Sequence, residues 1–142
     1  MGTVKAFCHP PKVGHWSKIK MDSGEPCWIS ISQQGVLIKK STLGLFGKVI
    51  IDLRPNSPTF KKWNGFELNS KNYRQLYVPK GFAHGFQSLE DDSEVFYLVS
   101  EYHNSISETG IRWNDPVFKI NWPLKPTKIS KKDESWPNFT SS

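Results

Sequence analysis

Runs of strand-forming residues, each bounded by turn-forming residues, recur about every ten positions along this chain of 142 residues. The run GKVIIDLR (47–54) is rich in β-branched residues and is followed by the turn PNSP (55–58). The run EVFYLVSEYH (94–103) combines β-branched and aromatic residues and contains neither glycine nor proline. Short strands at this spacing are typical of an all-β sandwich or barrel.

Helix is expected to be scarce, because no segment carries a 3.6-residue apolar stripe over three turns. Only SKKDESW (130–136) has the character of a short helix, with Ser130 as its N-cap. The segment from Asn114 onwards is interrupted by prolines and holds Trp122 and Trp136. We therefore expect a single domain over residues 1–142, with a C-terminal arm that wraps the core.

Composition limits the classes of partner. The net charge is +6, but the lysines are spread in pairs along the chain, which is typical of a solvated surface and not of a nucleic-acid-binding stripe. Two or three such charges suffice to bind a small anion such as a nucleotide diphosphate. There is no run of about 18 apolar residues and no apolar signal-peptide core, so we expect a cytoplasmic protein that binds no membrane.

The reactive residues favour acid–base chemistry. The four histidines form no HxH or HExxH pair, and Cys8 and Cys27 form no CxxC, so we expect neither a metal nor a cofactor. No GxSxG or phosphate-binding glycine loop is present. Proton transfer is the remaining enzymatic option, with these candidate groups: His84, Glu94, Tyr97 and Asp133.

Two of these candidates have several possible roles. His84, in VPKGFAHGF (78–86), suits a metal ligand, an acid–base group, a substrate contact or a core histidine with local hydrogen bonds. Strand alternation places Tyr97 on one face with Val95 and Val99. Its ring then packs in the core, or its hydroxyl points into a cavity, and composition alone favours the core.

Longer blocks of the sequence resemble a known family. PKGFAH (79–84) has the Pro-x-Gly-x-x-His form of the second cupin motif. Over residues 44–137 the chain is similar to dTDP-4-dehydrorhamnose 3,5-epimerases, and these blocks carry the resemblance: VIIDLRPNSPTFKKW (49–63), RQLYVPKGFAHGF (74–86), EVFYLVSEYHN (94–104) and GIRWNDPVFKINWP (110–123).

The resemblance implies a cupin-type jelly-roll β-barrel that needs neither metal nor cofactor and is usually a homodimer. It implies an isomerase for deoxysugar (rhamnose-type) and surface-polysaccharide synthesis. The substrate would be dTDP-4-dehydro-6-deoxyglucose, epimerised at carbon 3, carbon 5 or both.

The resemblance also implies roles for individual residues. Tyr97 falls on the proton donor, and Asp133 falls on the aspartate that pairs with the catalytic base. His84 falls on a histidine that lines the sugar pocket. Glu108 and Lys132 fall on positions that contact the nucleotide-sugar.

The base itself departs from the family pattern, which has a histidine in an Arg-Gly-Leu-His stretch. Counting back from Asp52 places Cys27 there, with Gly24 at the arginine and Leu37 at a later lysine. Starting instead from GTVKAF (2–7) places Cys8 at the histidine. His9 is then one position away and becomes the candidate base.

Three explanations of this departure remain open. The chain is a diverged, catalytically inactive cupin that binds a nucleotide-sugar or a partner, or it is active with a relocated base such as His9. Alternatively, residues 8–46 come from a truncated or frame-disrupted gene. A nucleic-acid-binding β-barrel is a further alternative, but it rests only on net charge and aromatic residues.

Overall fold

A computed structural model describes residues 17–21, 26–31, 36–39, 45–99 and 109–140, with side chains over 47–98 and 109–140. The described strands form two antiparallel sheets. The smaller sheet has four strands in the order β1 (Ser17–Met21), β8 (Ser93–Val99), β3 (Val36–Lys39) and β6 (Leu76–Val78). The larger has five strands in the order β5 (Trp63–Asn69), β4 (Leu45–Asp52), β7 (Phe82–Ser88), β2 (Pro26–Ile31) and β9 (Gly110–Ile111).

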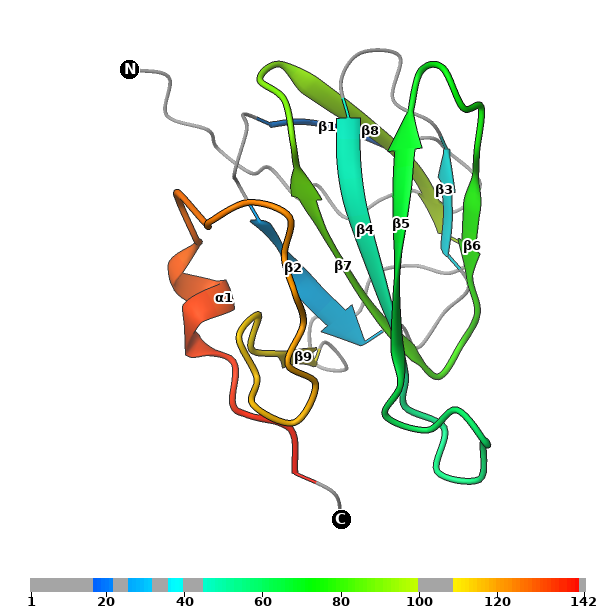
Figure 1. Cartoon of the computed structure of the whole chain (residues 1–142), viewed down its shortest axis with the longest axis vertical. Helices are drawn as coiled ribbons and strands as arrows, with labels where there is room; N and C mark the ends of the chain where they lie inside the picture. Colours follow the sequence, from blue (N-terminus) through cyan, green and yellow to red (C-terminus); the bar gives the residue numbers. More distant parts are fainter. Residues whose placement is uncertain (1–16, 22–25, 32–35, 40–44, 100–108, 141–142) are drawn as a thin grey trace.

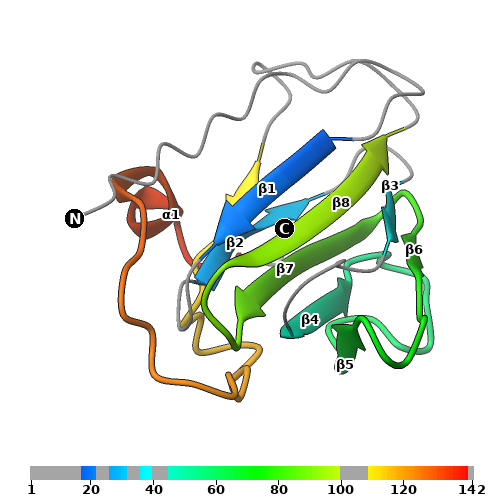
Figure 2. The ribbon, with the colours of Figure 1, turned by 90° about the horizontal axis from the view of Figure 1, so that it is seen from above.

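The two sheets face one another and enclose an interior core (Figure 2). Its buried members are Leu68 and Phe86 from the larger sheet and Val78 and Val95 from the smaller one. Because successive strand residues alternate between faces, Phe86 and His84 share the inward face of β7. The prediction of an all-β fold is confirmed for the described residues.

The outward face of the larger sheet is covered by the C-terminal arm (Figure 1). Val49, Ile51 and Ala83 on this face form a second core with Phe118 from the arm. The buried Gln87 accepts a hydrogen bond from the backbone nitrogen of Leu124 at 3.0 Å and donates one to its carbonyl oxygen at 2.9 Å. The predicted wrapping arm is therefore confirmed, whereas a single domain over all of residues 1–142 stays a prediction.

The short helix α1 (Lys131–Ser135) lies where the sequence predicts one. The Ser130 hydroxyl caps it by accepting a hydrogen bond from the Asp133 nitrogen at 3.1 Å. After the helix, Trp136 packs over Gly110 of β9. Among the described residues, no helix has the length and apolar character needed to cross a membrane.

The turn after β4 is built around the buried carboxylate of Asp52. Its oxygens accept hydrogen bonds from the Arg54 guanidinium at 2.8 and 2.9 Å. They also accept hydrogen bonds from the hydroxyls of Ser57 and Thr59 at 2.5 and 2.6 Å. Arg54, with help from the two hydroxyls, holds the pKa of Asp52 well below its usual range. This charged carboxylate fixes the turn that leads into β5.

Candidate active site

His84 lies in the middle of β7, opposite Ile50 of β4 and Ser30 of β2. The turn before it needs glycine: Gly81 has a φ of 87°, and a Cβ there would lie 2.8 Å from Cγ of Arg54. The glycine of the Pro-x-Gly-x-x-His pattern therefore allows the chain to turn into β7. That turn places the His84 imidazole on the inward face of the sheet.

His84 is paired with Lys48, which is not among the site residues expected from the sequence. The Nζ atom of Lys48 lies 2.7 Å from Nδ1 of His84, and both side chains are buried, at 1% and 7% exposure. The Lys48 Nζ also lies 5.0 Å from the ring centroid of Phe86. Burial, and then the nearby charge of Lys48, lower the pKa of His84 well below its ordinary value. His84 is therefore a neutral hydrogen-bonding group.

A signal for Lys48 is present in the sequence. In GKVIIDLR, Lys48 alternates with Val49 and Ile51, which are buried under the arm. A lysine on the opposite face of such a strand reaches solvent only if that face is exposed. Here that face is the interior of a two-sheet fold, so the lysine is buried with it.

Tyr97 approaches the same interior from the opposite sheet. It lies on β8 and packs against the interior core, which contains Phe86 and Val95. The predicted alternation, with Val95 and Tyr97 on one face, is confirmed. His84 and Tyr97 therefore lie on the inward faces of opposite sheets, which enclose one core.

Asp133 lies on α1, which contacts β2. Its carboxylate is buried, at 5% exposure, and accepts a hydrogen bond from the Ser130 hydroxyl. Lys132, one residue earlier, is exposed, and its Nζ lies 5.9 Å from the ring of Trp136. The helix thus turns Asp133 towards the protein and Lys132 towards solvent.

Four further residues were considered for the base or for contacts with the nucleotide-sugar. His9, Cys8 and Glu108 lie outside the described residues. Cys27 belongs to β2, where its backbone pairs with that of Phe86. The described residues contain no group of three or more histidine, cysteine, aspartate or glutamate side chains arranged to hold a metal ion.

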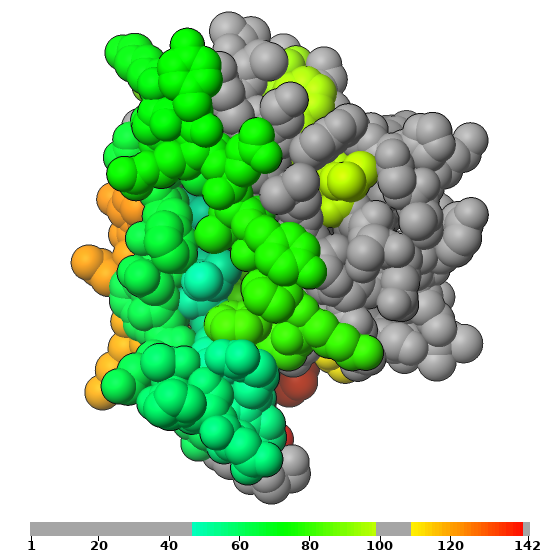
Figure 3. All heavy atoms as spheres, turned by 90° about the vertical axis from the view of Figure 1, so that its right-hand side faces the viewer, coloured from blue at the N-terminus to red at the C-terminus, as the bar shows by residue number. Residues whose placement is uncertain are grey.

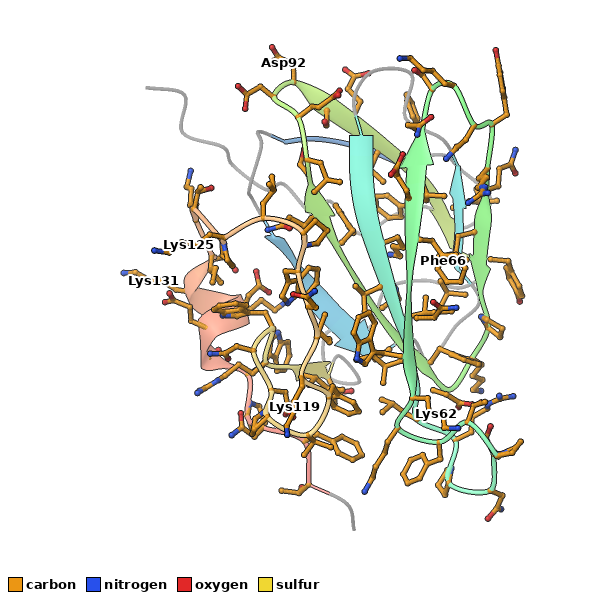
Figure 4. All side chains as sticks on the ribbon, in the orientation of Figure 1. Lys62, Phe66, Asp92, Lys119, Lys125 and Lys131 are labelled. Carbon is orange, nitrogen blue, oxygen red and sulfur yellow. The ribbon has the colours of Figure 1, made fainter. Side chains whose placement is uncertain are left out.

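A hollow of about 300 Å³ opens between β5 and β6, and β4 is visible within it (Figure 3). Two of its walls, Leu68 and Leu76, also belong to or pack on the interior core. Phe66 lines it from β5 (Figure 4), and Arg74 and Gln75 complete the lining. The hollow therefore borders the interior core at the edge between β5 and β6.

Known proteins are similar to this chain in both sequence and architecture. The family model for dTDP-4-dehydrorhamnose 3,5-epimerase matches residues 29–141. The enzyme of that name from Shigella flexneri is 38% identical over 109 residues, which are 77% of this chain and 60% of the relative. The Escherichia coli K12 enzyme is 45% identical over 96 residues, which are 67% and 52% of the two chains. This chain thus spans little more than half the length of those two relatives.

Solved structures agree with these sequence matches. The Bacillus anthracis dTDP-4-dehydrorhamnose 3,5-epimerase, crystallised with TDP and PPi, superposes with a TM-score of 0.83 at 34% identity, covering 90% of this chain and 75% of that one. The Legionella pneumophila enzyme, in complex with dTDP-4-keto-L-rhamnose, gives a TM-score of 0.80 at 29% identity, covering 92% and 77%. The cupin-type jelly-roll expectation is confirmed. This chain belongs to the dTDP-4-dehydrorhamnose 3,5-epimerase family.

Proposed function

We propose that this protein is a nucleotide-sugar isomerase that epimerises dTDP-4-dehydro-6-deoxyglucose at carbon 3, carbon 5 or both, in deoxysugar synthesis. The observation that carries the proposal is that His84 and Tyr97 lie on the inward faces of two facing sheets, in a chain of this family. Epimerisation needs groups on both faces of a sugar ring. A core placed between two facing sheets can supply such groups.

Histidine and tyrosine side chains suit the chemistry of epimerisation next to a keto group. A proton on a carbon next to the 4-keto group is acidic enough for removal by a histidine when the enolate oxygen is stabilised. Tyr97 returns a proton on the opposite face, which inverts the centre. His84 binds the sugar, and its neutral ring suits a hydrogen-bonding role.

Asp133 orients the base in this mechanism. Its buried carboxylate, on a helix that contacts β2, suits a residue that holds an imidazole. His9 is our candidate for that imidazole, and Glu108 and Lys132 are our candidates for contacts with the nucleotide-sugar.

The proposed ligand is a dTDP-linked 4-keto-6-deoxy sugar. Two similar structures were crystallised with ligands of this chemistry, TDP in one case and dTDP-4-keto-L-rhamnose in the other. A net charge of +6 favours approach of a diphosphate. We further propose a cytoplasmic homodimer that needs neither metal nor cofactor.

Deuterium exchange tests the reaction directly. The chain is incubated with dTDP-4-keto-6-deoxyglucose in deuterated water, and proton NMR follows carbons 3 and 5. We expect label at one or both carbons, unaffected by EDTA, with the E. coli K12 relative as the positive control. Stabilisation by dTDP in a thermal shift assay with no label at either carbon would contradict the enzyme and leave a binding protein.

Substitution of the candidate base follows in the same assay. We expect His9→Ala to abolish labelling, because no proton is removed without a base. His15→Ala is the matched control and should label normally. Equal labelling by the two variants would remove His9 from the mechanism.

A further inference from the structure

The buried side chains of Lys48 and His84 form a hydrogen bond, and its proton belongs either to the lysine or to the histidine. With Nζ and Nδ1 only 2.7 Å apart, one atom donates a hydrogen bond and the other accepts it. The ordinary pKa of lysine, about 10.4, lies well above that of histidine, about 6.5. The proton therefore rests on the lysine.

A second contact of Lys48 agrees with this assignment. Its Nζ lies 5.0 Å from the centroid of the Phe86 ring, a distance at which the face of an aromatic ring attracts an ammonium ion. A charged Lys48 also opposes a second positive charge on His84, whose pKa is lowered by burial and by this same neighbour. Both effects favour an ammonium beside a neutral imidazole.

An imidazole that accepts at Nδ1 has its lone pair there, so its single proton is on Nε2. We infer that Lys48 is a positioning residue, which holds His84 as the neutral Nε2–H tautomer and so makes it a hydrogen-bond donor to the sugar. The part of this inference that concerns the sugar rests on the proposed function. The tautomer itself does not.

It follows that His84 and the catalytic base are different residues. A histidine with its proton on Nε2 and its Nδ1 lone pair occupied by Lys48 has no free basic nitrogen. It therefore cannot be the group that removes the proton from the sugar carbon. It can donate to an oxygen that gains negative charge, such as the keto oxygen of the developing enolate.

The experiment reads the tautomer from the full chain at pH 7. Long-range proton–nitrogen correlation spectra distinguish Nδ1–H, Nε2–H and cationic rings, and His84→Gln identifies the His84 signals by their loss. We expect the Nε2–H form in the wild type. A cationic ring or a proton on Nδ1 would overturn the inference.

Lys48→Met removes the donor while keeping an unbranched side chain of similar length. We expect the His84 ring to lose its fixed Nε2–H form. We also expect kcat to fall about tenfold, less than the hundredfold or more that follows loss of a donor to the reacting oxygen itself. Lys62→Met makes the same exchange at an exposed lysine and should change neither quantity.

Each outcome decides a separate question. If Lys48→Met keeps the Nε2–H form, Lys48 does not hold the tautomer and the inference is wrong. If that variant does not fold, the wild-type spectrum still decides the protonation state. If the tautomer changes as expected but the wild type labels no substrate, the proposed function fails and the role of Lys48 in holding His84 stands.

Discussion

At the scale of single residues, Asp52 is the clearest source of pH-dependent stability. Its pKa is depressed in the folded protein by Arg54, Ser57 and Thr59, from an ordinary value of 3.8. The stabilisation is therefore complete above that value and is lost as the pH falls below it. We predict that Asp52→Asn lowers the free energy of unfolding by about 1–3 kcal/mol at pH 7, and that this deficit shrinks towards pH 3.

Urea denaturation followed by tryptophan fluorescence at pH 7, 5 and 3 measures this deficit. Asp92→Asn is the matched control, because Asp92 is exposed and lies at the opposite end of the molecule from Lys62 and this turn (Figure 4). A constant deficit across the three pH values would mean that the Asp52 carboxylate acts through its shape and not through its charge.

Tyr97 offers a test of chemistry at a single atom. We predict that Tyr97→Phe keeps the wild-type unfolding midpoint, because the ring that packs on the interior core is retained. Epimerisation should fall by at least about a hundredfold, the usual scale for loss of a general acid, while deuterium exchange by the base continues. The ratio of exchanged to inverted product in the NMR assay measures this separation.

Tyr77→Phe is the control for Tyr97. Tyr77 is 60% exposed, and the variant loses the same hydroxyl outside the interior. Unchanged epimerisation in Tyr97→Phe would show that Tyr97 is a core tyrosine only.

At the scale of elements, the close contact between β9 and the segment after α1 holds the helix that carries Asp133. A Cβ on Gly110 would lie 2.4 Å from Cε2 of Trp136, so the indole has to move. We predict that Gly110→Ala lowers the free energy of unfolding by about 1–3 kcal/mol. It should also reduce deuterium exchange, because α1 shifts against β2.

Gly65→Ala is the matched substitution on β5. A Cβ there would meet its nearest atom, Cζ3 of Trp63, at 3.6 Å, which is an ordinary contact. Thermal unfolding and exchange rates of the two variants are compared side by side. Equal effects would mean that the Gly110–Trp136 contact does not position the helix.

At the scale of the whole molecule, we predict a homodimer. Tyr77 on β6 and Tyr73 in the loop before it are 60% and 74% exposed, and exposed aromatic side chains are enriched where protein surfaces associate. Sedimentation equilibrium over a hundredfold range of protein concentration should give twice the mass of one chain. A single-chain mass throughout that range would rule out a stable dimer.

Much of the strand content could be predicted from local pattern. The runs at 47–54 and 94–103 overlap most of β4 and β8, and Ser130 does cap the predicted helix. β5 begins only at Trp63, because the side chains of Ser57 and Thr59 hold the preceding turn to Asp52. β1 (Ser17–Met21) was missed, since its polar sequence becomes a strand only by pairing with β8.

Of the site residues, His84 could be predicted from the sequence, but its partner Lys48 could not. The Pro-x-Gly-x-x-His pattern was enough to single out His84, because the glycine and the turn are local requirements of the chain. The partner of His84 depended on the pairing of β4 with β7, which brings together residues 36 positions apart. Because Lys48 is buried between the two facing sheets, it is a fixed neighbour of the imidazole and not a surface charge. No local pattern specifies such a pair, because its proton is placed by desolvation and by a contact that exists only in the folded protein.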